Sequence, residues 1–229
     1  MFACGLKFIV SFTAVLDSIG GGRAYLVVDN ASTDATPGLC RELSARDGRY
    51  ITVWAPENRN VVDAYLRGFR EALAQGHEYI IEMDAGLSHD PADIPMFLNG
   101  LMEGNDCVFG SRYVEGGSNS DSPLFRRGLS RGGTIAAQWL LGARLADMTS
   151  GFEGFRRDVL ARLVAYPLLS KGHFYQTEVR HLLRKTRWIE VPIHYRAPSP
   201  RVANSSIRNS IDVLLHYFLK RLAGNSPSV

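Results

Sequence analysis

The chain has 229 residues, of which 45% are hydrophobic and 21% are charged, as in ordinary globular domains and unlike disordered or fibrous chains. Its net charge of +3 is too small to indicate nucleic-acid binding, but it suits an anionic ligand or an anionic membrane face. Three scattered cysteines, Cys4, Cys40 and Cys107, argue against a disulfide framework or a zinc site and suit a reducing cytosol. No apolar run of about 18 residues occurs, so no membrane span is predicted.

The N-terminal segment, MFACGLKFIVSFTAVL (1–16), has an apolar centre like that of a secretory signal. Lys7 interrupts this centre, and no clear small-residue cleavage site follows it. We therefore expect the residues LKFIVSF (6–12) to form a buried strand.

From residue 25 to residue 113, short apolar runs alternate with amphipathic helical patterns. Strands are expected at 25–30, 51–56, 79–84 and 107–113, and helices at 35–47, 61–76 and 90–103. Thr33 or Asp34 is placed to cap the first helix, and Asp90 with Pro91 opens the third. This alternation predicts a single α/β domain, 1–229, with a Rossmann-like, mostly parallel sheet flanked by helices.

The second half of the chain is less regular. We expect a loop at 115–123, a long helix at 124–142, a turn at 150–155 followed by a short helix, a strand at 189–196, and a last helix from about Ser206 to Leu222. The sequence shows no internal repeat, linker or low-complexity segment.

Polar residues follow each of the predicted strands. Asp29 and Asn30 follow the first strand, Asn58 the second, Asp84 the third and Arg112 the fourth. Because ligands bind beyond the carboxyl ends of parallel strands, we expect these side chains to converge on one crevice. Helix capping accounts for the hydroxyl and acidic residues of the first turn, but not for Asp29 and Asn30, which precede the cap.

The turn that follows Asp84 raises the question of a metal ion. A divalent cation that bridges a diphosphate binds carboxylate oxygens, and Mg²⁺ often takes only one or two of them. Asp84 supplies one carboxylate, but Gly86 stands where a second acid would complete an Asp-x-Asp pair. Ser88, His89 and Asp90 could add a weaker ligand or act through water, whereas helix capping is the simpler explanation for Ser88 and Asp90.

Arginines gather after the fourth strand. Arg112 ends that strand, and Arg126 and Ser130 lie four positions apart, on one face of the next helix. Guanidinium groups and a hydroxyl suit a phosphate, although a solvated basic helix face is the alternative. The strand-end position of Arg112 favours phosphate.

Two further segments hold candidate residues. Glu153, within MTSGFEGFRR (148–157), is a candidate contact to the acceptor or the sugar. Arg201 lies in a proline-bearing segment, 194–206, that is either a loop closing over phosphates or an ordinary exposed connection.

These motifs together resemble glycosyltransferase family 2, and within it they are most similar to the dolichyl- and polyprenyl-phosphate mannose (sugar) synthases. The resemblance runs from about residue 25 to 222, through VVDNASTDAT (27–36), EMDAGLSHDP (82–91), GSRYVEGG (110–117), RRGLSRG (126–132) and TSGFEGFRR (149–157). It implies a GT-A fold and an inverting transfer of a sugar from a GDP- or UDP-sugar to a polyprenyl or dolichyl phosphate.

The resemblance also implies roles for individual residues. Residues 1–113 would bind the nucleotide and residues 114–229 the acceptor. Donor contacts would come from Asp29, Asn30, Asp34, Asn58, Asp84 and Arg201. Asp84 would bind a metal ion, with Ser88 as a further candidate ligand. Acceptor contacts would come from Arg112, Arg126, Ser130 and Glu153. The catalytic set would be Asp84, Arg112, Arg126 and Ser130.

The sequence departs from the family pattern in three places. The Pro-x-Tyr-Asn-Glu motif is missing, and LKFIVSFTAVLDSIGGG (6–22) stands in its place. Gly86 and Ser88 replace a second acid and a polar residue, so that a bound Mg²⁺ or Mn²⁺ would depend more on the donor diphosphate. Glu153 stands where the family has an arginine, and it would weaken an anion site.

A lipid phosphate acceptor requires contact with a membrane surface, and we expect a cytoplasmic protein that is peripheral at the inner membrane face. The last helix fits an interfacial helix or a helix packed on the core equally well. Two other functions stay open. A saccharide or other hydroxyl acceptor would require a general base, with Glu153 or Asp147 as candidates. A non-catalytic nucleotide-sugar-binding relative would account for Gly86.

Overall fold

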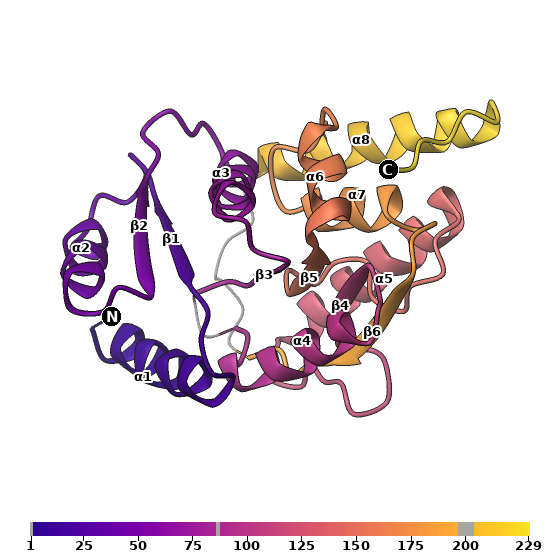
Figure 1. The fold of residues 1–229 in the computed structure, drawn as a ribbon. Coiled ribbons are helices and arrows are strands. Elements are labelled where there is room, and N and C mark those ends of the chain that lie inside the picture. Colours follow the sequence, from indigo (N-terminus) through magenta and orange to yellow (C-terminus); the bar gives the residue numbers. More distant parts are fainter. Residues whose placement is uncertain (1, 86–87, 197–203) are drawn as a thin grey trace.

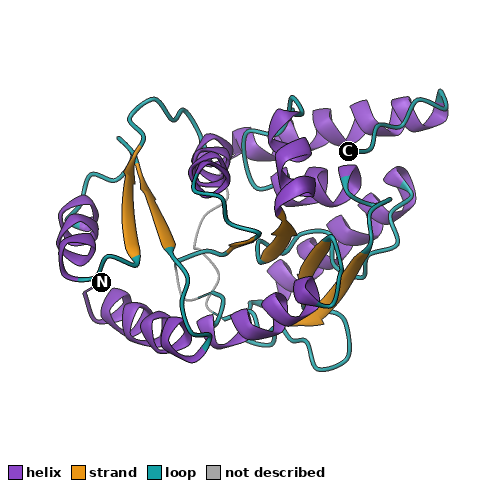
Figure 2. Ribbon diagram, viewed as in Figure 1, coloured by secondary structure: helices purple, strands orange, loops and turns teal. Residues whose placement is uncertain are grey.

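The computed structural model describes residues 2–85, 88–196 and 204–229. Helices and strands alternate through most of this chain (Figures 1 and 2). In chain order the elements are α1 (Phe2–Ser18), β1 (Ala24–Val28), α2 (Thr36–Arg46), β2 (Tyr50–Trp54), α3 (Val61–Ala74), β3 (Tyr79–Glu82), the 3₁₀ helix η1 (Pro91–Asp93), α4 (Ile94–Met102), β4 (Cys107–Ser111), α5 (Leu124–Leu141), β5 (Glu153–Arg156), α6 (Arg157–Ala165), α7 (Tyr175–Leu182), β6 (Trp188–Pro192) and α8 (Asn204–Leu222).

The strands of the described residues form two sheets. β1 pairs in parallel with β2, and a larger sheet has the order β3-β5-β4-β6. β6 is parallel to β4, whereas β5 is antiparallel to both of its neighbours. Consequently β3, β4 and β6 run in one direction and β5 alone opposes them. The predicted α/β class with a mostly parallel sheet flanked by helices is confirmed. Because β3 and β4 run in the same direction, the residues that follow them, Asp84 and Arg112, lie at the same end of the larger sheet.

The predicted buried strand at 6–12 is wrong, because these residues belong to helix α1. Phe8, Phe12 and Val15 recur every three to four positions, which places them on one face of a helix. Phe8 and Val15 are buried, and the Phe12 ring lies 6.1 Å from that of Tyr50 in β2. Packing against the small sheet therefore favours a helix, although the apolar composition of these residues is typical of a buried strand.

The predicted turn at 150–155 is wrong in part, because its second half belongs to β5. This strand is inserted between β3 and β4, with Glu153 opposite both Glu82 and Phe109. Gly154 allows α4 to approach closely, since a Cβ there would lie 3.3 Å from Leu101 Cδ1. Hydrogen bonds on both edges hold β5 in place, despite its short length and its glycine.

Each face of the larger sheet is covered by helices, because side chains alternate along a strand. On one face, Phe109 and Phe155 pack with buried residues of α6, α7 and α8. On the other, Val108 packs with Phe97 and Leu101 of α4. Figure 1 shows α1 and α8 on opposite sides of the molecule. Among the described residues, no helix combines the length and the apolarity that crossing a bilayer would need.

Candidate active site

The carboxyl ends of β1 and β2 bring three predicted donor residues together. Asp29 Oδ1 accepts a hydrogen bond from Ala31 N at 2.9 Å, and Asn58 Nδ2 lies 3.5 Å from Asp29 Oδ2. Asn30 Nδ2 donates to the carbonyl of Pro56 at 3.0 Å, which joins the loops after the two strands. The amide and carboxylate groups that gather here can form hydrogen bonds with a base or a ribose.

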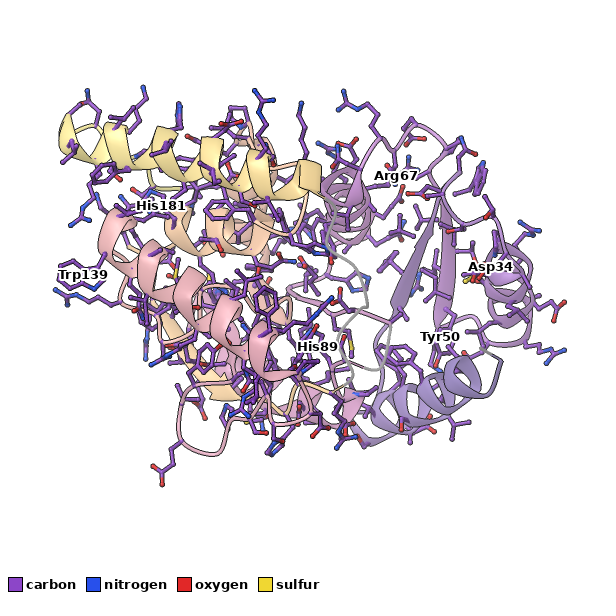
Figure 3. The ribbon with its side chains drawn as sticks, turned by 180° about the vertical axis from the view of Figure 1, so that it is seen from behind. Asp34, Tyr50, Arg67, His89, Trp139 and His181 are labelled. Carbon is purple, nitrogen blue, oxygen red and sulfur yellow. The ribbon has the colours of Figure 1, made fainter. Side chains whose placement is uncertain are left out.

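Asp34 lies apart from this group. Its Oδ1 accepts a hydrogen bond from the backbone N–H of Thr36, the first residue of α2, at 3.0 Å, and the hydrogen bonds from Thr36 lower the pKa of Asp34. Figure 3 shows Asp34 at the outer edge of the N-terminal half, whereas His89 lies near the centre of the molecule. The structure thus gives Asp34 a place at the helix start, and a donor contact for it stays a prediction.

Asp84 lies two residues beyond β3, at the carboxyl end of the larger sheet. Its Oδ1 accepts a hydrogen bond from the Tyr65 hydroxyl of α3 at 2.9 Å. Its Oδ2 lies 3.8 Å from His89 Nε2. The Asp84 side chain is 42% exposed, so a ligand can reach it. Burial, together with the charge of Asp84, raises the pKa of Tyr65, so the phenol remains a hydrogen-bond donor at neutral pH.

His89 is enclosed beside this carboxylate. Its side chain is 0% exposed, and its ring lies between Phe152, at 5.1 Å, and Tyr195, at 5.4 Å. Neither ring nitrogen has a hydrogen-bond partner among the described residues. Burial lowers the pKa of His89 to about 4, and the ring is therefore neutral at pH 7.

The donor set around Asp84 fits a divalent ion only in combination with other ligands. The described residues contain no group of three or more His, Cys, Asp or Glu side chains that could hold a metal ion, and Gly86 lies outside them. Ser88 is buried and its carbonyl accepts from Arg196 N, while Asp90 accepts from Ala92 N at the start of η1, as predicted. Asp84 Oδ2 and the unpaired His89 nitrogens are the available protein ligands, and a diphosphate and water could supply the other ligands of a divalent ion.

The arginine end of the site is a closed hydrogen-bond network. Arg112 donates from Nε and Nη2 to the two oxygens of Asp147, each at 2.7 Å, and from Nη2 to Thr149 Oγ1 at 2.5 Å. Ser130 Oγ lies 2.9 Å from the same Thr149 oxygen. Burial alone would raise the pKa of Asp147, but the hydrogen bonds and charge of Arg112 outweigh it and lower that pKa to about 2. Thr149, which the motifs did not single out, thus connects Arg112 with Ser130.

Tyr195 joins the two ends of the site. Its ring contacts His89, and the Arg112 guanidinium lies 5.4 Å from the centre of that ring. Burial and the charge of Asp84 raise the pKa of Tyr195, whereas the charges of Arg112 and Arg126 lower it. All of these charges therefore lie within electrostatic reach of one phenol. Arg126, half-buried in the first turn of α5, belongs to the same region.

Glu153 does not occupy the position that we predicted for an acceptor contact. It is fully buried, and Arg180 Nε donates to its Oε1 at 2.8 Å. The same guanidinium binds the carbonyl oxygens of Asp147, Gly110 and Ser150. Because β5 directs Glu153 into the protein, its charge meets Arg180 instead of an acceptor. Arg201, which was predicted as a donor contact, lies outside the described residues.

Comparisons with known proteins agree with this fold. The sequence matches the family described as Glycosyl transferase family 2 over residues 10–164. The polyprenol monophosphomannose synthase of Mycolicibacterium smegmatis is 32% identical over 192 residues, which cover 81% of this chain and 72% of that protein. The undecaprenyl-phosphate mannosyltransferase of Micrococcus luteus is 33% identical over 172 residues, or 74% of this chain and 70% of that protein.

A solved structure gives the same fold. Glucosyl-3-phosphoglycerate synthase from Mycobacterium tuberculosis, in complex with Mn²⁺, UDP-glucose and phosphoglyceric acid, superposes with a TM-score of 0.61 at 19% identity, covering 90% of this chain and 74% of that one. The fold is thus that of the GT-A glycosyltransferases, as predicted. More narrowly, the chain belongs to glycosyl transferase family 2.

Proposed function

We propose that the protein transfers a sugar from a nucleotide-sugar donor, a GDP- or UDP-sugar, to a polyprenyl or dolichyl phosphate. The names of the two bacterial relatives favour mannose as the sugar and a polyprenyl phosphate as the acceptor. The observation that carries the proposal is the position of Tyr195, which lies between His89, beside Asp84, and the guanidinium of Arg112. Tyr195 thus lies between the region of Asp84, where we place the donor diphosphate, and the region of Arg112, where we place the acceptor phosphate. A sugar transfer requires these two groups to lie close to each other.

A phosphate acceptor is favoured over a saccharide or other hydroxyl acceptor. A hydroxyl acceptor needs a general base within reach, and the two predicted candidates were Asp147 and Glu153. Both are fully buried and hydrogen-bonded to arginines, Arg112 and Arg180 respectively. A phosphate monoester is already ionised near neutral pH and needs no such base.

The chemistry then consists of positioning and charge stabilisation. An oxygen of the acceptor phosphate attacks the anomeric carbon, the bond from that carbon to the donor diphosphate breaks, and the nucleoside diphosphate leaves with the electron pair. Residues 1–113 supply Asp29 and Asn58 for the nucleotide, and residues 114–229 supply Arg126 and Ser130 for the acceptor. Arg112 Nη1, directly after β4 and just before the boundary between the two segments, completes the acceptor site. A divalent ion, when bound at Asp84, screens the charge of the leaving diphosphate.

We also propose that the protein binds the inner, cytoplasmic face of a membrane as a peripheral protein. α8 packs on the core through Val213 and Tyr217, which are buried, and a second apolar face of this helix is exposed. That exposed face consists of Ile207, Ile211, Leu215, Leu219 and Leu222. At the start of α5, Leu124 and Phe125 are each 80% exposed, directly before Arg126. Apolar side chains beside a cationic one suit the interface of an anionic bilayer.

Transfer of labelled mannose from GDP-mannose, or of sugar from UDP-sugars, to a short-chain polyprenyl phosphate tests the proposal. We expect Arg126→Ala to raise the acceptor KM by roughly 10- to 100-fold, because a charge-assisted contact to phosphate contributes about 1.5–3 kcal/mol. Nucleotide affinity should not change. Arg127→Ala, which removes the adjacent exposed arginine, is the matched control and should stay within twofold of the wild type.

Two results would contradict this function. If the wild-type protein binds nucleotide-sugars but transfers nothing to any lipid phosphate, the acceptor is wrong. If Arg126→Ala and Arg127→Ala behave alike, the acceptor site does not lie at this end of α5.

A further inference from the structure

We propose that His89 supplies a nitrogen ligand, beside Asp84, to the divalent ion that accompanies the donor diphosphate. This role presupposes the donor site proposed above and extends it. A mixed nitrogen and oxygen donor set favours Mn²⁺ or Co²⁺ over Mg²⁺, because imidazole suits transition metals whereas Mg²⁺ selects oxygen ligands. The imidazole would then take the place of the second carboxylate ligand that an Asp-x-Asp pair supplies.

The separation of the two side chains fits an ion between them. His89 Nε2 and Asp84 Oδ2 lie 3.8 Å apart, which is too long for a direct hydrogen bond. Metal–ligand bonds of about 2.0–2.2 Å on either side allow two ligand atoms to lie up to roughly 4.3 Å apart. The observed separation of these two atoms therefore lies within the span of two ligands to one ion.

The state of His89 indicates a ligand. A buried polar atom without a partner costs about 1–3 kcal/mol, and most such atoms in native proteins have a partner or an explanation. Both ring nitrogens of His89 lack one among the described residues, and the side chain is 0% exposed. Phe152 and Tyr195 hold the ring from two sides, which fixes its direction as a ligand requires.

Asp84 is oriented to match. The Tyr65 hydroxyl binds Oδ1, which turns Oδ2 toward His89. Gly151 keeps space beside that oxygen, because a Cβ at this position would lie 3.8 Å from Asp84 Oδ2 and 3.2 Å from Gln176 Nε2. Diphosphate oxygens and water would fill the remaining coordination positions.

The experiment measures metal ligation directly. Wild-type protein labelled with ¹⁵N-histidine is mixed with UDP or GDP and Mn²⁺, and pulsed electron paramagnetic resonance detects ¹⁵N coupled to the manganese. Calorimetry gives the Mn²⁺ and Mg²⁺ dissociation constants of each nucleotide complex, and nucleotide affinity without metal is recorded separately. His89→Phe keeps the ring contacts with Phe152 and Tyr195 but removes the nitrogens. His173→Phe, at an exposed histidine, is the matched control.

We expect histidine ¹⁵N coupling in the wild type and in His173→Phe, and its loss in His89→Phe. The Mn²⁺ dissociation constant should rise at least tenfold in His89→Phe, with a smaller change for Mg²⁺. If His89→Phe does not fold, His89→Gln and the labelled wild-type spectrum decide the question.

Three results would overturn the inference. Mn²⁺ that binds without histidine coupling, or with unchanged affinity in His89→Phe, would exclude the nitrogen ligand. Nucleotide binding that no metal affects would do the same while leaving the proposed donor site intact. Failure of the wild type to bind either nucleotide would overturn the donor site itself, and this inference with it.

Discussion

The two halves of the molecule differ in their buried ion pairs: among the described residues, the pairs with both side chains buried all involve the C-terminal half. In the N-terminal half, ion pairs such as Arg59 with Asp63 lie at the surface, where the Arg59 side chain is 83% exposed. By contrast, Asp147 of the C-terminal half pairs with Arg112, directly after β4, and Glu153 pairs with Arg180. All four of these side chains are between 0% and 7% exposed. Surface pairs are screened by water and contribute little, whereas buried pairs are strongly coupled to their surroundings.

The difference indicates how each half works. Asp29 and Asn58, at the proposed donor end, share one long contact of 3.5 Å, which leaves room for them to adjust to the proposed nucleotide. Arg112 is held by bidentate bonds of 2.7 Å before any ligand arrives. Fixed donors cost no reorganisation during the reaction, which is how preorganised sites stabilise charge. If the proposed roles hold, the acceptor end is therefore preorganised and the donor end is adaptable.

The largest effect should come from breaking the Arg112–Asp147 pair. Asp147→Asn leaves the Arg112 guanidinium buried without its counter-charge, and we expect the free energy of unfolding to fall by about 3–5 kcal/mol. Arg59→Ala, which breaks an exposed pair, should change it by less than about 1 kcal/mol. Urea unfolding measures both. Similar losses in the two variants would show that the halves do not differ in this way.

The sequence predicted the strand ends well, because the rule that places ligands beyond parallel strands requires only element order. Asp29, Asn58 and Asp84 lie where that rule expects them. The sequence did not predict strand β5, because Glu153 and Gly154 have low propensity for a central strand. The buried Glu153 is paired with Arg180, which lies 27 positions further along the chain. Tyr195 was missed for a related reason, since its contacts with His89 and Arg112 join residues that are far apart in the sequence. No local pattern signals such contacts.

The next effect concerns the two carboxyl groups that face each other across β3 and β5. Burial and the charge of Glu153 raise the pKa of Glu82 well above its usual value, and burial raises the pKa of Glu153 to about 7. The folded state thus binds more protons here than the unfolded chain between about pH 4.5 and 7, and this contribution to stability is lost as pH rises. Burial lowers the pKa of His89 and His181, so these side chains are protonated in the unfolded chain but not in the folded one over part of the same range. A difference between variants is therefore the informative quantity.

Glu82→Gln isolates this contribution. The glutamine keeps an oxygen for the Tyr175 hydroxyl, which donates to Glu82 in the wild type, but it carries no titrating group. Relative to the wild type, we expect the variant to gain up to about 1.4 kcal/mol per pH unit as pH rises from 5 to 7. Unfolding by urea at several pH values measures the gain. A flat difference, like that expected for the exposed Glu103→Gln, would show that no proton is held between these strands.

The smallest effect tests the same contrast at the surface. Phe125 in the C-terminal half and Leu39 in the N-terminal half are both exposed, but only Phe125 lies directly before Arg126. Burying one large apolar side chain in an interface contributes about 1.5–3 kcal/mol, so Phe125→Ser should weaken binding to vesicles of phosphatidylcholine and phosphatidylglycerol by roughly tenfold. Leu39→Ser should leave that binding unchanged. Co-sedimentation with vesicles measures both variants. Equal binding by both would move the membrane surface away from α5, whereas no vesicle binding by the wild type would mean that the acceptor phosphate reaches the site from solution.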